Sequence, residues 1–125
     1  MKNVLLDTNI LIGHLNGDQK STDILLKLDR IRISVMSEYE LLAGLTDVRK
    51  DQKTAAQELL DVSVVYPVTS EIARKAAEYT VKHGGRKTVD RIIAATMVEQ
   101  RLTALVTANA ADFPMIKTIS TQRDR

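Results

Sequence analysis

The chain has 125 residues, of which 44% are hydrophobic and 27% charged, and this composition indicates one globular domain over residues 1–125 and excludes general disorder. The net charge of +2 is too small to indicate nucleic-acid binding by itself, and an aromatic content of 3% excludes a base-stacking platform. The absence of cysteine excludes disulfide bonds, thiol nucleophiles and thiolate metal sites, so any metal must be held by oxygen or histidine ligands.

The first half of the chain predicts two strands, each followed by a helix. The apolar residues 4–6 predict a strand that ends at Asp7, after which apolar positions recur at helical spacing to residue 15. A second amphipathic helix is expected over residues 18–31, and an alternating strand over residues 31–35. We expect Ser37 to open the helix that follows this strand.

The second half of the chain continues the alternation of strands and helices. Three further strands are expected, over residues 62–66, 103–107 and 116–119. A helix is expected over residues 51–61, and two more are expected to begin at the capping residues Thr69 and Thr88. The first of these two should end near Gly84, and the polar residues 119–125 should form a flexible tail.

This alternation predicts an α/β fold in which five parallel strands form one sheet with helices on both faces. In such sheets the functional crevice lies beyond the carboxyl ends of the strands. No apolar run approaches the roughly 20 residues that a membrane-spanning helix requires, and the first residues lack a signal-peptide pattern. We therefore expect a cytoplasmic protein.

Four carboxylates follow the predicted strands and should fall on one edge of the sheet. They are Asp7, Glu40, Asp90 and Asp112. Each also has a structural interpretation. An acid in the first turn of a helix complements the helix dipole by ~0.3–1 kcal/mol, Ser37 and Glu40 belong to a possible capping box, and Asp112 has the character of a turn residue.

Taken together, the four acids favour a metal site. Carboxylates that converge on one crevice repel one another, and a cation is the simplest way to relieve the repulsion. Oxygen ligands without cysteine or a suitable histidine pair select Mg²⁺ or Mn²⁺, which also coordinate phosphates. The chemistry that such a site supports is hydrolysis of a phosphodiester.

The acids lie in four short sequence blocks that resemble the signature blocks of PIN domains, and in particular those of VapC-type toxins. The blocks are DTNILI at residues 7–12, SEYELLAG at 37–44, DRIIAAT at 90–96 and TANAADF at 107–113. Their order and spacing match the family, and with the strands around them they cover the chain from residue 4 to about residue 119. One departure is Ala108, which stands where the family often has a basic residue.

The resemblance implies a metal-dependent endoribonuclease that cleaves a structured RNA such as tRNA or rRNA. It also implies one or two Mg²⁺ or Mn²⁺ ions, a homodimer, and a cognate antitoxin as partner and inhibitor. By position, Asp7 and Asp90 are metal ligands, Glu40 is a ligand that often acts through water, and Asp112 is the fourth acid. Whether Asp112 or Asn109 contacts the metal directly is left open by the sequence. Thr8 and Asn9 would orient Asp7.

Basic residues beside Asp90 are candidates for contacts with RNA phosphates, although a solvated basic turn is nearly as good an interpretation. They are Arg86, Lys87 and Arg91, with Arg91 the strongest candidate.

Three other functions compete with the nuclease as interpretations of this sequence. A haloacid-dehalogenase-like phosphatase requires a second Asp where this chain has Asn9, and a receiver domain requires a lysine where the late strand ends in Thr107. A catalytically weak PIN-like module for RNA binding or scaffolding remains the alternative, and a nuclease assay with Mn²⁺ would separate it from the enzyme.

Overall fold

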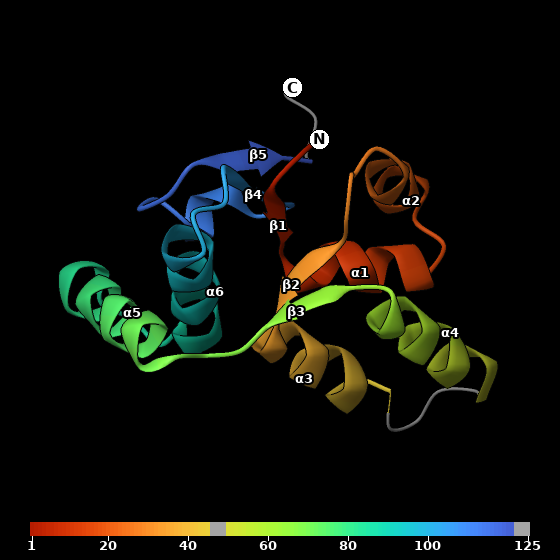
Figure 1. Cartoon of the computed structure of the whole chain (residues 1–125), viewed down its shortest axis with the longest axis horizontal. Helices are drawn as coiled ribbons and strands as arrows, with labels where there is room; N and C mark the ends of the chain where they lie inside the picture. The colour runs from red at the N-terminus through yellow and green to blue at the C-terminus, as the bar shows by residue number, and fades with distance from the viewer. Residues whose placement is uncertain (46–49, 122–125) are drawn as a thin grey trace.

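The computed structural model describes residues 1–45 and 50–121. Within these residues strands and helices follow one another along the chain (Figure 1). The strands are β1 (Val4–Leu6), β2 (Arg32–Ser34), β3 (Val64–Tyr66), β4 (Ala104–Thr107) and β5 (Thr118–Ser120). The helices are α1 (Thr8–Leu15), α2 (Gln19–Leu26), α3 (Val35–Ala43), α4 (Lys50–Asp61), α5 (Ser70–His83) and α6 (Thr88–Glu99), with a 3-10 turn η1 (Ala110–Asp112). The α/β alternation predicted from the sequence is confirmed.

The strands pair in parallel, but they form two sheets rather than the predicted single sheet of five. One sheet has the order β1-β4-β5, with Leu5 opposite Leu105, and the other pairs β2 with β3. β1 and β2 lie next to each other, and just before them the Asp29 amide donates to the Met1 carbonyl oxygen at 3.0 Å. The two sheets therefore meet at β1 and β2 without a ladder of hydrogen bonds between these two strands.

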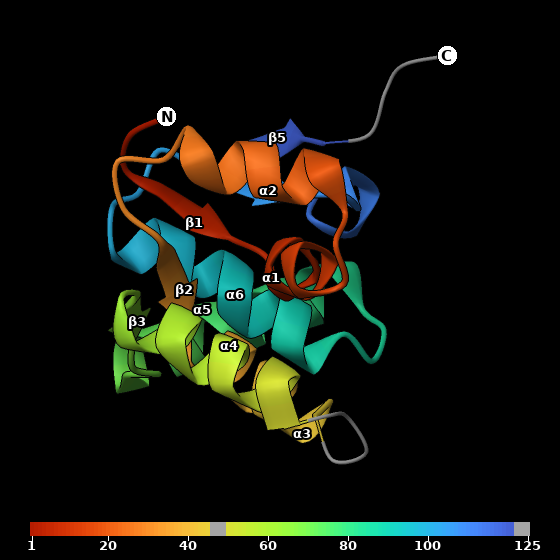
Figure 2. The same cartoon turned by 90° about the vertical axis from the view of Figure 1, so that its right-hand side faces the viewer.

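Helices cover both faces of the β1-β4-β5 sheet, as predicted. Side chains alternate along β1, so Val4 and Leu6 face a core that includes Ile10 and Ile33, while Leu5 faces the opposite core. Helices α1 to α4 lie on the first side, with α1 between α2 and α4, and α5 and α6 lie on the second side (Figures 1 and 2). Burial on both faces explains why β1 is entirely apolar and β4 is apolar up to its last residue, Thr107.

Helix starts agree with the sequence at some positions and differ at others. Thr69 caps α5 as expected, because its hydroxyl accepts a hydrogen bond from the Ile72 amide at 3.2 Å. Ser37 does not open α3, which begins at Val35 with Ser34 as its cap. Thr88 is the first residue of α6 rather than its cap.

The ends of two other predicted segments also differ from the structure. Helix α2 ends at Leu26 rather than at residue 31. Residues 119 and 120, expected in a flexible tail, belong to β5 and pair with β4, while residues 122–125 lie outside the described part of the chain. Among the described helices, none has both the length and the hydrophobicity needed to traverse a bilayer.

Candidate active site

The four predicted acids line one open cleft, of about 310 Å³, where the carboxyl ends of β1 and β4 meet the first turns of α1 and α6. Glu40 reaches this cleft from α3, and Asp112 reaches it from η1. The rest of the lining is provided by Thr8, Asn9, Ile12 and Asn109. Residues from four separate blocks of the sequence therefore share one surface, at the position expected for a parallel α/β sheet.

Asp7 is held at the base of the cleft by hydrogen bonds to both of its carboxylate oxygens. It directly follows β1 and serves as the N-cap of α1, where its Oδ1 accepts from the Thr8 amide at 2.8 Å. Its Oδ2 accepts from the Thr107 hydroxyl at the end of β4 at 2.7 Å. The side chain is only 6% exposed, and this burial raises the pKa of Asp7 above its ordinary value despite the two hydrogen bonds. The charges of Glu40 and Asp112 raise it further.

Glu40 is oriented by a buried hydroxyl pair that the sequence did not reveal. The Thr8 hydroxyl oxygen lies 2.6 Å from Glu40 Oε1 and 2.8 Å from the Ser37 hydroxyl oxygen. An ionised carboxylate only accepts hydrogen bonds, so the single hydroxyl hydrogen of Thr8 goes to Glu40, and Ser37 donates to Thr8.

The alternative interpretation of Ser37 and Glu40 as a capping box is therefore wrong. Ser37 lies inside α3 and is fully buried, and Glu40 faces the cleft instead of the Ser37 amide. The spacing of Ser37 and Glu40, just under one helical turn, is the signal that could have placed both side chains on one face.

Asp90 carries the clearest electrostatic signature of the site. It lies in the first turn of α6, and its pKa is raised to about 6, chiefly by burial and then by the charges of Asp7 and Asp112. The ammonium of Lys87 opposes this shift. Lys87 also forms an ion pair with the Asp112 carboxylate at the rim. The crowding of carboxylates inferred from the sequence is thus present in the fold.

The three basic residues near Asp90 occupy different environments. Arg86 and Lys87 are exposed, as a contact with phosphates requires, and Lys87 lies at the rim of the cleft beside Asp112. Arg91 is only 6% exposed, and its guanidinium donates to two backbone carbonyl oxygens, those of Gly84 and Asp112. The expectation that Arg91 contacts RNA is therefore corrected, because helical geometry turns Arg91 inward while Asp90 faces the cleft.

The donor set fits a hydrated divalent cation. Asn9 Oδ1 is buried beside the carboxylates and has no hydrogen-bond partner among the described residues, so a polar acceptor is left for a further ligand. Within residues 1–45 and 50–121, no three carboxylate or histidine groups lie close enough together to hold one ion directly. A divalent cation in the cleft would therefore be held by one or two carboxylates, with water or substrate oxygens completing its coordination.

The PIN domain family model matches residues 4–116 of the chain. The chain belongs to the PIN-domain family. This match confirms the resemblance inferred from the four sequence blocks. No curated protein sequence matches the chain.

Several solved structures share this fold. A toxin–antitoxin complex from Klebsiella pneumoniae superposes with a TM-score of 0.84 at 25% identity, covering 97% of this chain and 99% of that chain. DNA-bound VapBC from Salmonella typhimurium gives 0.81 at 21% identity, covering 98% and 100%. FitAcB from Neisseria gonorrhoeae gives 0.78 at 21% identity, covering 94% and 97%.

Proposed function

We propose that this PIN domain is a metal-dependent endoribonuclease and the toxin component of a toxin–antitoxin pair, which hydrolyses phosphodiesters in a structured RNA such as tRNA or rRNA. The observation that carries the proposal is the convergence of four carboxylates on one cleft, with the pKa of Asp90 raised to about 6. Shifts of this kind concentrate at functional sites. Support for the toxin role comes from the similar solved structures, which include a toxin–antitoxin complex and VapBC.

The acidic side chains of the cleft have separate roles in the proposed metal site. Asp7 and Asp90 would hold Mg²⁺ or Mn²⁺, Glu40 would contribute through a water molecule, and Asp112 would provide further negative charge at the rim. When bound, the cation stabilises charge on the phosphodiester and increases the acidity of a neighbouring water. Thr8 and Thr107 keep the carboxylates of Glu40 and Asp7 in place through hydrogen bonds of 2.6 and 2.7 Å.

Substrate binding depends on charge and shape. Arg86 and Lys87 are exposed beside the acidic cleft, where they can pair with phosphates on either side of the scissile bond. Stacking contributes little, because the chain has only one phenylalanine, three tyrosines and no tryptophan. A surface of this type recognises the shape of a folded RNA and not the base sequence of a long single strand.

Adding Mn²⁺ or Mg²⁺ to the metal-free protein is expected to raise its melting temperature. The fold gathers the acids and the unfolded chain does not, so linkage stabilises the fold by ~2.7 kcal/mol at a hundredfold excess of metal over Kd. Thermal unfolding in EDTA and in a Mn²⁺ series measures the effect. A melting temperature that neither metal changes, together with RNA cleavage that continues in EDTA, would contradict the proposed metal site.

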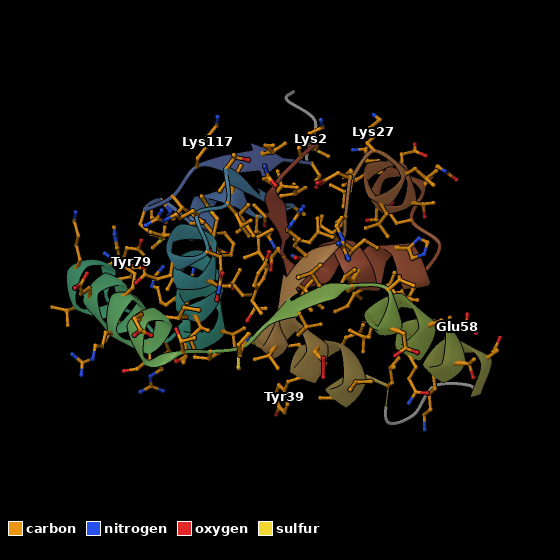
Figure 3. All side chains as sticks on the ribbon, viewed as in Figure 1. Lys2, Lys27, Tyr39, Glu58, Tyr79 and Lys117 are labelled. Atoms are coloured by element: carbon orange, nitrogen blue, oxygen red, sulfur yellow. The ribbon has the colours of Figure 1, made fainter. Side chains whose placement is uncertain are left out.

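An antitoxin helix is proposed to bind an apolar groove that adjoins the cleft. The groove lies between α1, α3 and α4 and is lined by Ile12, Leu15, Leu41 and Leu45 among others. Ile12 lines both the groove and the acidic cleft, so a helix in the groove would reach the active site. On the same helix α3, Leu42 is 41% exposed, and Tyr39 projects away from the body of the molecule (Figure 3).

Replacing Ile12 by aspartate is expected to weaken the complex with the antitoxin at least about tenfold, because a charge would be placed in the apolar lining of the groove, where Ile12 is 40% exposed. The binding partner is the product of the gene immediately upstream, and affinity is measured by titration calorimetry. Val81→Asp on α5, where the side chain is 88% exposed, is the matched control and should leave affinity unchanged. Sedimentation should show a homodimer. A monomer at micromolar concentration would count against the homodimer. The absence of a stable complex with the upstream gene product would count against the antitoxin partner.

A further inference from the structure

The Arg91 side chain is a buried charge without a carboxylate partner. Its exposed fraction is 6%, and among the described residues no carboxylate forms an ion pair with it. Removing a guanidinium from water is unfavourable unless its N–H groups find acceptors. Arg91 Nη2 donates to the Gly84 carbonyl oxygen at 3.1 Å, and Nη1 donates to the Asp112 carbonyl oxygen at 3.4 Å, while the buried Nε finds no acceptor among the described residues.

These two carbonyls belong to segments that are far apart in the chain. Gly84 ends α5 in a left-handed backbone conformation, with φ of +67°, and leads into the exposed basic residues Arg86 and Lys87. Asp112 ends the η1 turn and carries one of the four cleft carboxylates. A planar guanidinium with several N–H groups can hold both segments at once, which a lysine ammonium does less well.

The first turn of α6 therefore serves the cleft in two ways. Asp90 projects into the cleft, and the next residue, Arg91, extends beneath the two loops that border it. The Asp112 and Phe113 amides donate only to carbonyls within the η1 turn, those of Asn109 and Ala110, each at 3.0 Å. The buried Phe113 side chain anchors the end of the turn in the core, and the Arg91 bond to the Asp112 carbonyl is a second attachment one residue earlier.

We propose that Arg91 is a positioning residue that clamps the Gly84 and Asp112 loops to α6 and thereby sets the place of the Asp112 carboxylate in the cleft. The role of Asp112 in a metal site rests on the proposed function, whereas the clamp itself does not. Loss of the clamp should loosen both loops together and weaken metal binding only through Asp112.

Amide hydrogen exchange tests the clamp without metal or RNA. Arg91→Met, which keeps an apolar stem and removes every donor, is expected to accelerate exchange of the Gly84, Asp112 and Phe113 amides by about tenfold or more. The Asp7 and Gln100 amides, which bond to the Val106 and Thr96 carbonyls, should keep their parental rates. If the variant folds poorly, Arg91→Lys is used, and it should release at least the Asp112 loop. Uniform acceleration over all amides, or none at either loop, would overturn the clamp.

A double-mutant cycle tests the consequence for Asp112, with Mn²⁺ affinity measured by titration calorimetry. Arg91→Lys should weaken Mn²⁺ binding by about tenfold in the parental chain but by less than about twofold when Asp112→Asn is already present. Equal losses in both backgrounds would show a general structural effect and overturn the positioning role. Arg32→Lys, which alters an ion pair with Asp29 away from the cleft, is the control and should not change affinity. If the parental chain binds no Mn²⁺, the proposed function fails, and hydrogen exchange still decides the clamp.

Discussion

Replacing Asp90 by asparagine is expected to lower RNA cleavage by about two orders of magnitude or more, while the metal-free protein stays as stable as its parent or becomes more stable. The pKa of Asp90 is raised to about 6 by burial and by the charges of Asp7 and Asp112, so its negative charge destabilises the metal-free fold. The asparagine side chain keeps the shape of the residue and removes that charge. Stabilisation by Mn²⁺ should shrink in the variant, because a ligand of the ion is lost.

The opposite pattern would make Asp90 a helix-terminal charge. In that case the substitution should cost ~0.3–1 kcal/mol through lost dipole complementarity and leave cleavage at the parental rate. Glu71→Gln is the matched control, since Glu71 is an exposed acid in the first turn of α5, outside the cleft. Thermal unfolding with and without Mn²⁺, run beside an RNA cleavage assay, separates the two outcomes.

Metal-free stability is expected to fall as pH rises from about 4 to about 6. An acid whose pKa is raised on folding, from 3.8 to about 6 for Asp90, binds more protons in the folded state than in the unfolded state over that interval. Unfolding therefore releases protons and becomes easier as pH rises. The change should be on the order of 1–2 kcal/mol after allowance for solvent screening of a partly exposed group. Asp7, whose pKa is also raised, contributes in the same direction.

The same protons must leave before Mn²⁺ binds, so Mn²⁺ affinity should rise with pH by up to about tenfold per unit below pH 6 and level off above it. Urea unfolding and calorimetric titrations between pH 4 and 8 measure both effects, and Asp90→Asn should flatten both profiles. Asp29 does not affect the pH dependence of stability between pH 4 and 6, because the Arg32 guanidinium lowers the pKa of Asp29 to about 2. The stability that this ion pair contributes is lost only in more acidic solution. Stability that rises with pH between 4 and 6 would contradict this electrostatic description of the cleft.

Much of the fold and the position of the acids could be predicted, because they depend on local pattern. The run of apolar residues that ends at Asp7 predicts, from local pattern alone, that this carboxylate lies at the end of a strand. Local pattern likewise predicts that Asp90 lies in the first turn of a helix, α6. The rules for parallel α/β sheets then bring such residues to one edge. The four acids do line one cleft.

The features that could not be predicted depend on contacts between distant segments. Ser37 satisfies the local rule for a cap, but Ser34 caps α3, and Ser37 is buried against Thr8, 29 residues earlier. Arg91 follows a cleft residue and has the charge of an RNA contact, yet its acceptors are loop carbonyls that only the folded chain supplies. The division of the strands into two sheets likewise depends on which strands meet in the folded chain.

The central claim is that the acidic cleft cuts RNA with the help of a divalent cation, and RNA cleavage before and after removal of metal tests it most directly. Purified protein is treated with EDTA, transferred into metal-free buffer, and incubated with total tRNA and rRNA before and after addition of Mn²⁺, with Asp90→Asn in parallel. We predict discrete cleavage products in the parental protein only after Mn²⁺ is added, and none from the variant. Cleavage that persists in EDTA, or Mn²⁺ binding without any RNA cleavage, would contradict the account, and the second result would identify a binding module in place of an enzyme.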